Sequence, residues 1–269
     1  MVPPLKKTSK SSGLGLWSQR LLAAVLLGGQ VIVHLISGRI HRRNTLDQMA
    51  VVGPDSLLIA LLTAAFVGMV FTIQVTREFI SFGAGTAVGG VLGLTLAREL
   101  APVLTAVVLA GRVGSAFAAE IGTMQVTEQI DALQMLKTDP IDYLVIPRVV
   151  ACCLMMPILT LLSFMTGMAG GLLISTGLYN VPYTVFLDSA QSFLDLWDLV
   201  SSIVKSLVFG MLIAIIGSSW GLTTTGGAKG VGQSTTTAVV TALLAIFISN
   251  FFLSWLMFQG LGSAILKGF

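Results

Sequence analysis

Four charged residues, Arg98, Glu99, Arg112 and Glu120, lie along one stretch of sequence that is otherwise mostly apolar. An ion in the middle of a membrane-spanning helix costs about 2.5–3.5 kcal/mol on insertion scales, so such residues usually serve a function. Arg98 and Glu99 could hold the charged part of a ligand, or they could anchor a helix end by reaching toward water. Arg112 lies deeper in the stretch, so we expect it to face protein or water rather than lipid.

Small residues recur at a spacing of four along the same stretch, in two rows. One row is Ala110, Gly114 and Ala118, and the other is Gly111 and Ser115. Small side chains let two helix backbones approach closely. These rows therefore predict close packing, either within one helix bundle or at a seam between two copies of the chain.

A polar segment, residues 122–142, follows. Within it Val126, Ile130 and Leu133 fall at positions i, i+4 and i+7 and form one apolar helical stripe. The other faces carry polar side chains, namely Thr127, Glu128, Asp131, Gln134 and Lys137. Asp139-Pro140 ends the helix. We predict a short amphipathic helix at about 124–136, which either lies at the membrane surface or docks its apolar face into a partner's groove.

The residues that catalysis requires are missing or isolated. His34 and His41 share one helical stripe and form neither a metal cluster nor part of a triad. The run 226–230, Gly-Gly-Ala-Lys-Gly, lacks the Gly-Lys-Ser/Thr of a phosphate-binding loop. Cys152 and Cys153 are adjacent and point in different directions on a helix, so they form no disulfide framework or metal pair. We predict no catalytic residue, no metal and no cofactor bound by this chain.

The elements that position these residues follow from composition. Of 269 residues, 55% are hydrophobic and 10% charged, against about 25% charged in soluble domains. Five long runs contain no Asp, Glu, Lys or Arg, namely 56–76, 79–97, 149–187, 206–228 and 230–266. A helix crosses a bilayer with about 20 apolar residues, whereas barrel strands would alternate in segments of about 10. The sequence predicts an all-α integral membrane protein, and its net charge of +3 does not indicate nucleic-acid binding.

Five membrane-spanning helices are expected, at 56–76 and at about 98–121, 146–177, 201–222 and 237–265. Residues 82–93 contain five glycines and predict a bend or re-entrant turn. We expect a loop or short surface helix at 178–200 and a Gly/Thr-rich loop at 223–237.

The N-terminal segment differs from the rest of the chain. Residues 21–38 are uncharged, are flanked by basic residues at both ends, and are followed by no cleavage site of a signal peptide. Polar side chains recur along one face, namely Gln30, His34, Ser37 and His41. We therefore predict an interfacial amphipathic helix within an N-terminal segment 1–44, followed by a membrane-spanning domain at 45–269. With a cytoplasmic N-terminus, the segment 122–142 lies inside and the acidic loop 178–200 outside, as the positive-inside rule prefers.

The run from Arg98 to Arg148, RELAPVLTAVVLAGRVGSAFAAEIGTMQVTEQIDALQMLKTDPIDYLVIPR, resembles the signature of the MlaE (YrbE) permeases. These are the membrane subunits of MCE-type lipid ABC transporters, and the chloroplast and cyanobacterial lipid-transport permeases belong to the same group. The similarity extends more weakly from about residue 45 to the C-terminus, including Phe66-Val-Gly-Met69 and Ser234-Thr-Thr-Thr237.

This resemblance implies a permease subunit that moves phospholipid or a similar lipid between the membrane and an MCE lipid-binding partner. Members work as homodimers with two copies of a separate cytoplasmic ABC ATPase, which binds ATP and Mg. A hexameric MCE-domain protein lies on the opposite side. The location implied is the bacterial inner membrane, or the chloroplast inner envelope for a plastid protein.

The resemblance also implies residue roles. Arg98 and Glu99 would lie near the lipid head, with Phe71, Phe79 and Leu104 lining the cavity for the acyl chains. The coupling helix would meet the ATPase, through Glu120, Thr127, Glu128, Gln129, Asp131 and Leu133. Helix or dimer packing would involve Gly111, Gly114 and Ser115.

Two other functions compete with this one, a secondary transporter or channel and a membrane scaffold without transport. Secondary transporters tend to show inverted repeats with broken helices, and five helices do not divide into two equal halves. Co-purification with an ATPase and an MCE protein would favour the permease.

Overall fold

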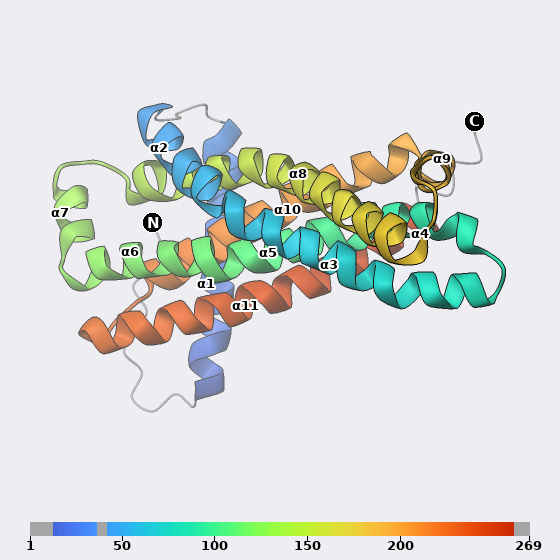
Figure 1. Cartoon of the computed structure of the whole chain (residues 1–269). Coiled ribbons are helices and arrows are strands. Elements are labelled where there is room, and N and C mark those ends of the chain that lie inside the picture. The colour runs from blue at the N-terminus through green and yellow to red at the C-terminus, as the bar shows by residue number, and fades with distance from the viewer. Residues whose placement is uncertain (1–12, 37–41, 261–269) are drawn as a thin grey trace. The chain divides into compact units, whose positions relative to one another are not determined.

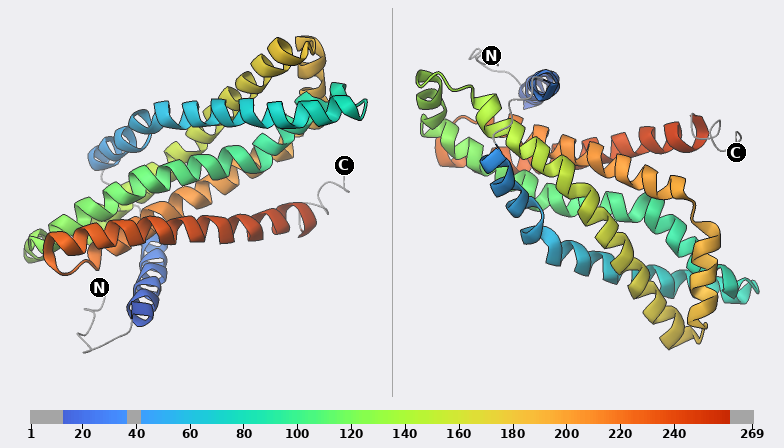
Figure 2. Two further views of the ribbon diagram at one scale, coloured as in Figure 1. Left: turned by 60° about the horizontal axis from the view of Figure 1, so that its bottom comes forward. Right: turned by 90° about the horizontal axis from the view of Figure 1, so that it is seen from above.

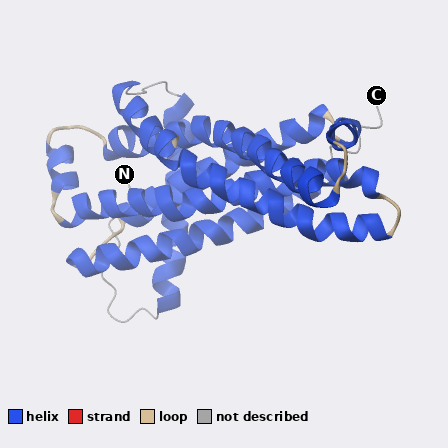
Figure 3. Ribbon diagram, in the orientation of Figure 1, coloured by secondary structure: helices blue, strands red, loops and turns tan. Residues whose placement is uncertain are grey.

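The computed structural model describes residues 13–36 and 42–260, and every regular element in these ranges is a helix (Figure 1; Figure 3). Five helical stretches are long and apolar enough to cross a membrane, namely Arg42–Ser81, Gly85–Val126, Ile141–Tyr179, Leu196–Leu222 and Gly227–Gln259. The predicted all-α fold with five spanning helices is confirmed. Ser37, His41 and the predicted helix end at 261–265 lie outside the described residues.

The stretches are built from consecutive helices. The first comprises α2 (Arg42–Val52) and α3 (Pro54–Ser81). The second comprises η1 (Gly85–Ala87), α4 (Val88–Thr95), η2 (Leu96–Leu100), α5 (Ala101–Leu109), η3 (Ala110–Gly114) and α6 (Ser115–Val126). The third comprises η4 (Ile141–Val145) and α8 (Ile146–Tyr179), the fourth is α10 (Leu196–Leu222), and the fifth comprises α11 (Gly227–Trp255) and η5 (Leu256–Gly260). The remaining helices are α1 (Gly13–Ile36), α7 (Gln129–Met135) and α9 (Tyr183–Phe193).

Backbone contacts divide the chain into two compact units. Unit 1 comprises the described residues up to Val52 together with Leu109–Cys153 and Gly210–Ile246. Unit 2 comprises Gly53–Val108, Leu154–Phe209 and the described residues from Phe247 onward. The long helices α8, α10 and α11 contribute residues to both units.

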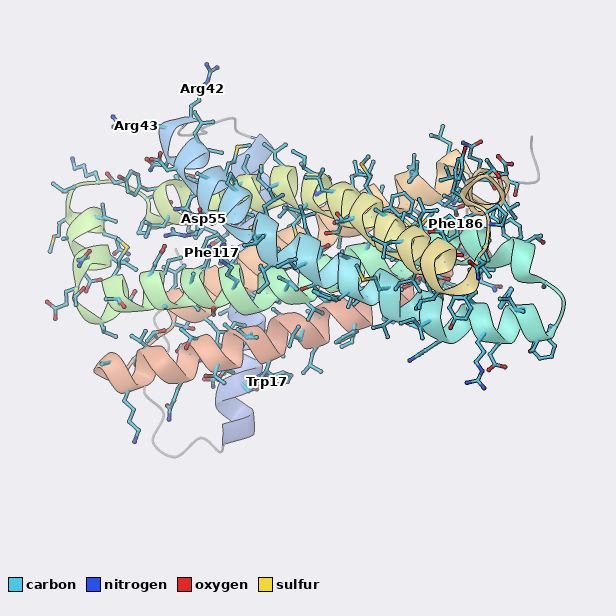
Figure 4. All side chains as sticks on the ribbon, viewed as in Figure 1. Trp17, Arg42, Arg43, Asp55, Phe117 and Phe186 are labelled. Carbon is cyan, nitrogen blue, oxygen red and sulfur yellow. The ribbon has the colours of Figure 1, made fainter. Side chains whose placement is uncertain are left out.

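In unit 2, α4 packs against α9, and the two helices lie side by side in Figure 1 and in Figure 2. Phe186 of α9, labelled in Figure 4, is buried with Val88, Leu92 and Leu96 in one apolar cluster. The approach is close because Gly89 has no side chain, and a Cβ atom there would lie 2.1 Å from the carbonyl oxygen of Phe186.

The bend predicted at 82–93 is wrong in its extent. The non-helical turn is confined to 82–84, where Gly83 adopts a φ of +73°, and the second spanning stretch begins at Gly85 rather than at about 98. The frequency of glycine suggested a flexible segment. Gly89 instead lies in helix α4, where its lack of a side chain lets α9 pack closely.

The segment 178–200 contains the short helix α9, one of the two structures expected there. Asp198, however, does not belong to a loop. It lies in the first turn of α10 and is fully buried (0% exposed).

In unit 1, the short helix α7 is anchored by its apolar side. Ile130 is buried with Ile121 and Leu144, and Leu133 packs against this cluster. The predicted range 124–136 is too long, because α6 continues to Val126 and the chain then turns at Glu128, which has a φ of +61°. The apolar stripe therefore packs onto the same chain and does not form a free docking face.

The polar stripe predicted on α1 lies on the side of the helix turned toward the protein. Leu27 and Val31 on that side are buried (1% exposed each), and His34 Nδ1 lies 2.5 Å from Asp142 Oδ1. The exposed side of α1 is apolar and includes Leu22 and Val25. The position of α1 at the membrane interface stays a prediction.

The loop predicted at 223–237 is mostly helical, since α11 begins at Gly227. Gly226 makes the turn with a φ of +92°. The hydroxyl groups of Thr236 and Thr237 donate to the carbonyl oxygens of Gly232 and Gln233, so these residues are satisfied inside the helix.

Replacing Gly89 by alanine should destabilise the protein by about 1–3 kcal/mol, because the new methyl group overpacks the contact between α4 and α9. The matched control is Gly177→Ala in α8, where a Cβ atom meets nothing within 4 Å. Thermal unfolding in detergent should show a lower midpoint for the first variant only. Equal midpoints would contradict the packing role of Gly89.

Candidate functional site

Arg98 and Glu99 lie on η2, a π-helical turn within the second spanning stretch. Single π-helical turns inside α-helices are frequent at functional sites. The backbone of this turn takes part in the site, because the carbonyl oxygen of Arg98 accepts a hydrogen bond of 2.7 Å from Lys205 Nζ.

The Glu99 carboxylate accepts three side-chain hydrogen bonds from two other helices. Lys205 Nζ lies 2.8 Å and Ser254 Oγ 2.7 Å from Glu99 Oε1, and Asn250 Nδ2 lies 2.7 Å from Glu99 Oε2. The Lys205 side chain is fully buried (0% exposed), whereas that of Glu99 is 41% exposed. Breaking a buried pair by removing one partner strongly destabilises a protein, because the other charge is left without compensation.

Arg98 makes a second ion pair beside the first. Its Nε atom donates to Asp198 Oδ1 at 2.7 Å, and Asp198 Oδ2 accepts from the backbone N–H of Asp195 at 3.1 Å. The guanidinium carbon lies 4.5 Å from the centre of the Phe258 ring, a cation–π distance. Among the described residues, none accepts a hydrogen bond from Arg98 Nη1 or Nη2, so these donors remain available to a ligand.

Both charged residues border an open hollow of about 470 Å³ in unit 2. Its lining combines this ion network with aromatic side chains, namely Leu94, Thr95, Arg98, Glu99, Phe251, Ser254, Trp255, Phe258 and Gln259. A guanidinium group with free N–H donors can bind a phosphate or carboxylate through two parallel hydrogen bonds. The aromatic rings offer apolar surface for the remainder of a ligand. The arrangement could accommodate an anionic ligand, and whether Arg98 and Glu99 bind one or anchor the helix end stays a prediction.

The predicted acyl-chain residues lie elsewhere in unit 2. Phe71 and Phe79 pack against the apolar cluster of α4 and α9. Leu104 borders a hollow of about 10 Å³, which has room for about one water molecule. Their contacts within the described chain are packing contacts, and acyl-chain lining by them stays a prediction.

Of the predicted coupling residues, four are exposed around α7, namely Thr127, Glu128, Gln129 and Asp131. Leu133 is half-buried against the Ile130 cluster. Glu120 accepts a hydrogen bond of 2.8 Å from Arg148 Nη2, and Arg148 also lies over the Phe117 ring. Glu120 thus pairs with its own chain.

The exposed apolar side chains of this region are Met135 and Leu136, which are 87% and 75% exposed. A partner that contacts α7 would therefore meet these two residues and the acidic ones, rather than the stripe that the sequence indicated.

The two rows of small residues have different surroundings. Gly114 packs within the bundle, where a Cβ atom would lie 3.3 Å from Ile213. Gly111 is exposed with nothing within 4 Å of a Cβ position, and Ser115 Oγ donates back to the Gly111 carbonyl oxygen at 2.5 Å. Arg112 faces protein as expected, with Nη1 donating to the Val51 carbonyl oxygen at 3.1 Å.

The sequence predicted no metal cluster around the histidines, yet the fold groups three side chains that can bind metal. Ligand atoms of His34, Asp139 and Asp142 lie within 4.8 Å of one another. Asp139 Oδ1 already accepts from the Ile141 backbone N–H at 2.9 Å, and His34 pairs with Asp142. These hydrogen bonds account for the grouping.

Lys205, Asp198 and Asn250 are the site residues that sequence reasoning missed. Lys205 and Asn250 each interrupt an otherwise apolar helix, and that pattern was the available signal. Asp198 carried no such signal, because it follows Asp188 and Asp195 in a polar segment.

Five helical stretches in the described part of the chain are long and apolar enough to span a membrane, and they define a multi-pass membrane protein. The model of the MlaE permease family matches residues 45–256, and the chain belongs to this family.

Relatives from Synechocystis, Arabidopsis thaliana and Rickettsia typhi support this assignment. A probable ABC transporter permease protein of Synechocystis is 72% identical over 253 residues, covering 94% of this chain and 96% of the relative. The chloroplast protein TRIGALACTOSYLDIACYLGLYCEROL 1 of Arabidopsis thaliana is 52% identical, covering 97% and 74%. A probable ABC transporter permease protein of Rickettsia typhi is 44% identical, covering 85% and 88%.

The protein is thus the permease subunit of an ABC transporter and is not an enzyme. ATP hydrolysis belongs to a separate ATPase subunit. This class sets aside the secondary-transporter and scaffold alternatives.

Replacing Glu99 by glutamine should destabilise the protein by about 3–5 kcal/mol, because the fully buried Lys205 is left without an opposite charge. Adding Lys205→Met to the same chain should restore part of the loss. Thermal unfolding of the two single variants and the double variant in detergent measures the coupling. Additive losses would mean that the two residues do not act as a pair.

Proposed function

We propose that this permease moves phospholipid or a similar lipid, and that the lipid head binds at Arg98 and Glu99. The observation that carries the proposal is the hollow of about 470 Å³, where a cation with free donors lies beside exposed aromatic rings. A lipid has the matching chemistry, with an anionic head attached to a large apolar body.

The network suits repeated binding and release. Lys205 and Asp198 hold Glu99 and Arg98 in place when no ligand is bound, so the site needs little rearrangement to accept one. Such preorganisation lowers the cost of binding. The phosphate of a lipid would use the Nη donors of Arg98 while Nε stays paired with Asp198.

The name of the Arabidopsis relative includes that of a galactolipid, trigalactosyldiacylglycerol, and describes that protein as chloroplastic. A lipid cargo for the present chain agrees with that name. The bacterial inner membrane, or the chloroplast inner envelope for a plastid protein, is the location that we propose, with the N-terminus cytoplasmic or stromal.

The assembly that we propose is a homodimer with two ABC ATPase subunits, which bind ATP and Mg, and a hexameric MCE-domain protein on the opposite side. Residues 45–269 would form the permease domain, and residues 1–44 would attach to the membrane surface. The row of Gly111, which is exposed, and Ser115, which is half-buried, is the dimer seam that we propose.

Helix α7 is the proposed contact with the ATPase. Glu128 and Asp131 are exposed there, and the buried Ile130 joins the helix to Ile121 of α6 and Leu144 of η4. A push on α7 would therefore reach two spanning stretches through one packed cluster.

Lipid bound at the site should be captured by a photocrosslinking residue placed at Trp255. Removing both members of the ion pair, by Arg98→Gln with Asp198→Asn, should lower this capture about tenfold, because a charge-assisted hydrogen bond contributes about 1.5–3 kcal/mol. The yield is read by mass spectrometry of the crosslinked protein.

The matched control carries the crosslinker at Leu58, an exposed residue of α3 outside the lining of the hollow, where capture should be insensitive to the double replacement. Unchanged capture at Trp255 in the double variant would refute head binding by Arg98.

Reversing the charges at Glu128 and Asp131 to lysine should lower the lipid-stimulated ATPase activity of the assembled transporter about tenfold or more. Like charges that are brought together at an interface cost several kcal/mol. Membrane insertion should be unchanged. Asp188→Lys, an exposed reversal on α9, is the control that should keep full activity, and normal coupling in the α7 variant would exclude α7 as the contact.

A further inference from the structure

A hollow of about 720 Å³ lies in unit 1 between α1 and the first turns of α11. Its lining contains two cations and several polar side chains, namely Trp17, Arg20, Lys229, Gly232, Gln233, Thr236 and Thr237. None of these residues is acidic. We propose that this hollow binds the headgroup of an anionic lipid.

The surroundings of Arg20 are the first observation that supports an anionic ligand in this hollow. Arg20 is half-buried, and its hydrogen bonds to Ser234 Oγ and the Thr223 carbonyl oxygen are long, at 3.5 Å each. Burial lowers the pKa of Arg20, but an arginine side chain stays protonated in proteins.

Among the described residues no carboxylate pairs with Arg20, whereas Arg98 and Arg148 pair with Asp198 and Glu120. Buried charges in proteins are usually paired. An anion supplied from outside the chain would complete the site.

The other lining residues fit a headgroup. Lys229 is exposed and supplies the second cation, so the lining carries two positive charges with no negative one. The exposed amide of Gln233 can donate to and accept from a polyol, and the exposed Thr236 oxygen, whose proton already bonds the Gly232 carbonyl oxygen, can accept from one. A phosphodiester or sulfonate headgroup with attached hydroxyl groups matches this set.

The surface beyond the hollow indicates a lipid rather than a soluble anion. Thr236, Val240 and Leu244 lie four residues apart and so share one face of α11, and the two apolar side chains are 51% and 48% exposed. A head at Thr236 would leave acyl chains to run along Val240 and Leu244.

Trp17 lies where α1 meets α11 (Figure 4), and its Nε1 atom donates to Thr241 Oγ1 at 3.3 Å. Tryptophan is enriched where the hydrocarbon of a membrane meets water. The hollow thus combines interface residues, uncompensated cations and an apolar track, on residues different from those of the Arg98 site.

The test uses the full-length protein purified from nanodiscs of phosphatidylcholine mixed with phosphatidylglycerol. Native mass spectrometry then counts the phosphatidylglycerol that stays bound. Arg20→Gln with Lys229→Gln should lower the affinity about 30-fold, at about fivefold for each cation near an anionic membrane surface. Lys229→Gln alone, at an exposed position that does not affect folding, should give about fivefold.

The matched control is Arg42→Gln with Arg43→Gln, which removes two exposed charges that project away from α2 in Figure 4. This pair should retain phosphatidylglycerol normally. An equal loss of phosphatidylglycerol in the control would mean that general surface charge, not this hollow, binds the lipid. Undiminished retention in the site variants would overturn the proposal. Displacement of the lipid by soluble glycerol phosphate would overturn the lipid claim in favour of a soluble anion.

Discussion

The ammonium group of Lys205 has no access to solvent, and the hydrocarbon surroundings of a spanning helix offer nothing else to neutralise it. It is held by three acceptors, the Glu99 carboxylate, the Arg98 carbonyl oxygen and Ser254 Oγ. These acceptors come from the second and fifth spanning stretches, so one buried cation links three of the five stretches. Losing the Glu99 charge would leave the buried ammonium group without an opposite charge, at a cost of several kcal/mol.

This constraint also shapes the candidate site. Because Lys205 and Asp198 satisfy Glu99 and one nitrogen of Arg98 from within, the outward side of the pair can remain open to a hollow without destabilising the fold. The π-helical turn η2 belongs to the same arrangement, since its carbonyl oxygen serves Lys205. Stability and the proposed ligand binding therefore depend on the same few residues.

In unit 1, a buried apolar contact rather than an ion network holds the candidate functional element, helix α7, in place. This short helix would be marginal alone, because seven residues form only about two turns. It is ordered because Ile130 inserts into a cluster of Ile121 and Leu144, while its acidic side chains stay exposed. A surface element fixed by one buried side chain can transmit force to the spanning helices without contributing its own core. The same unit contains Arg20, whose charge no described carboxylate balances.

The sequence by itself determined the class of protein, the number of spanning helices and the existence of α7, because long uncharged runs and a polar segment have few alternative structures. It also marked Arg98 and Glu99, since ions in apolar stretches are costly wherever they lie. The tertiary structure alone decided their partners: Asp198 looked like a loop residue, and the pairing spans about one hundred residues of chain. The tertiary structure also decided the role of Gly89. Only the packing of α9 against α4 shows that this glycine makes room for another backbone and does not bend its own. Local patterns report what a segment can do, whereas close contacts between distant segments depend on how the whole chain packs.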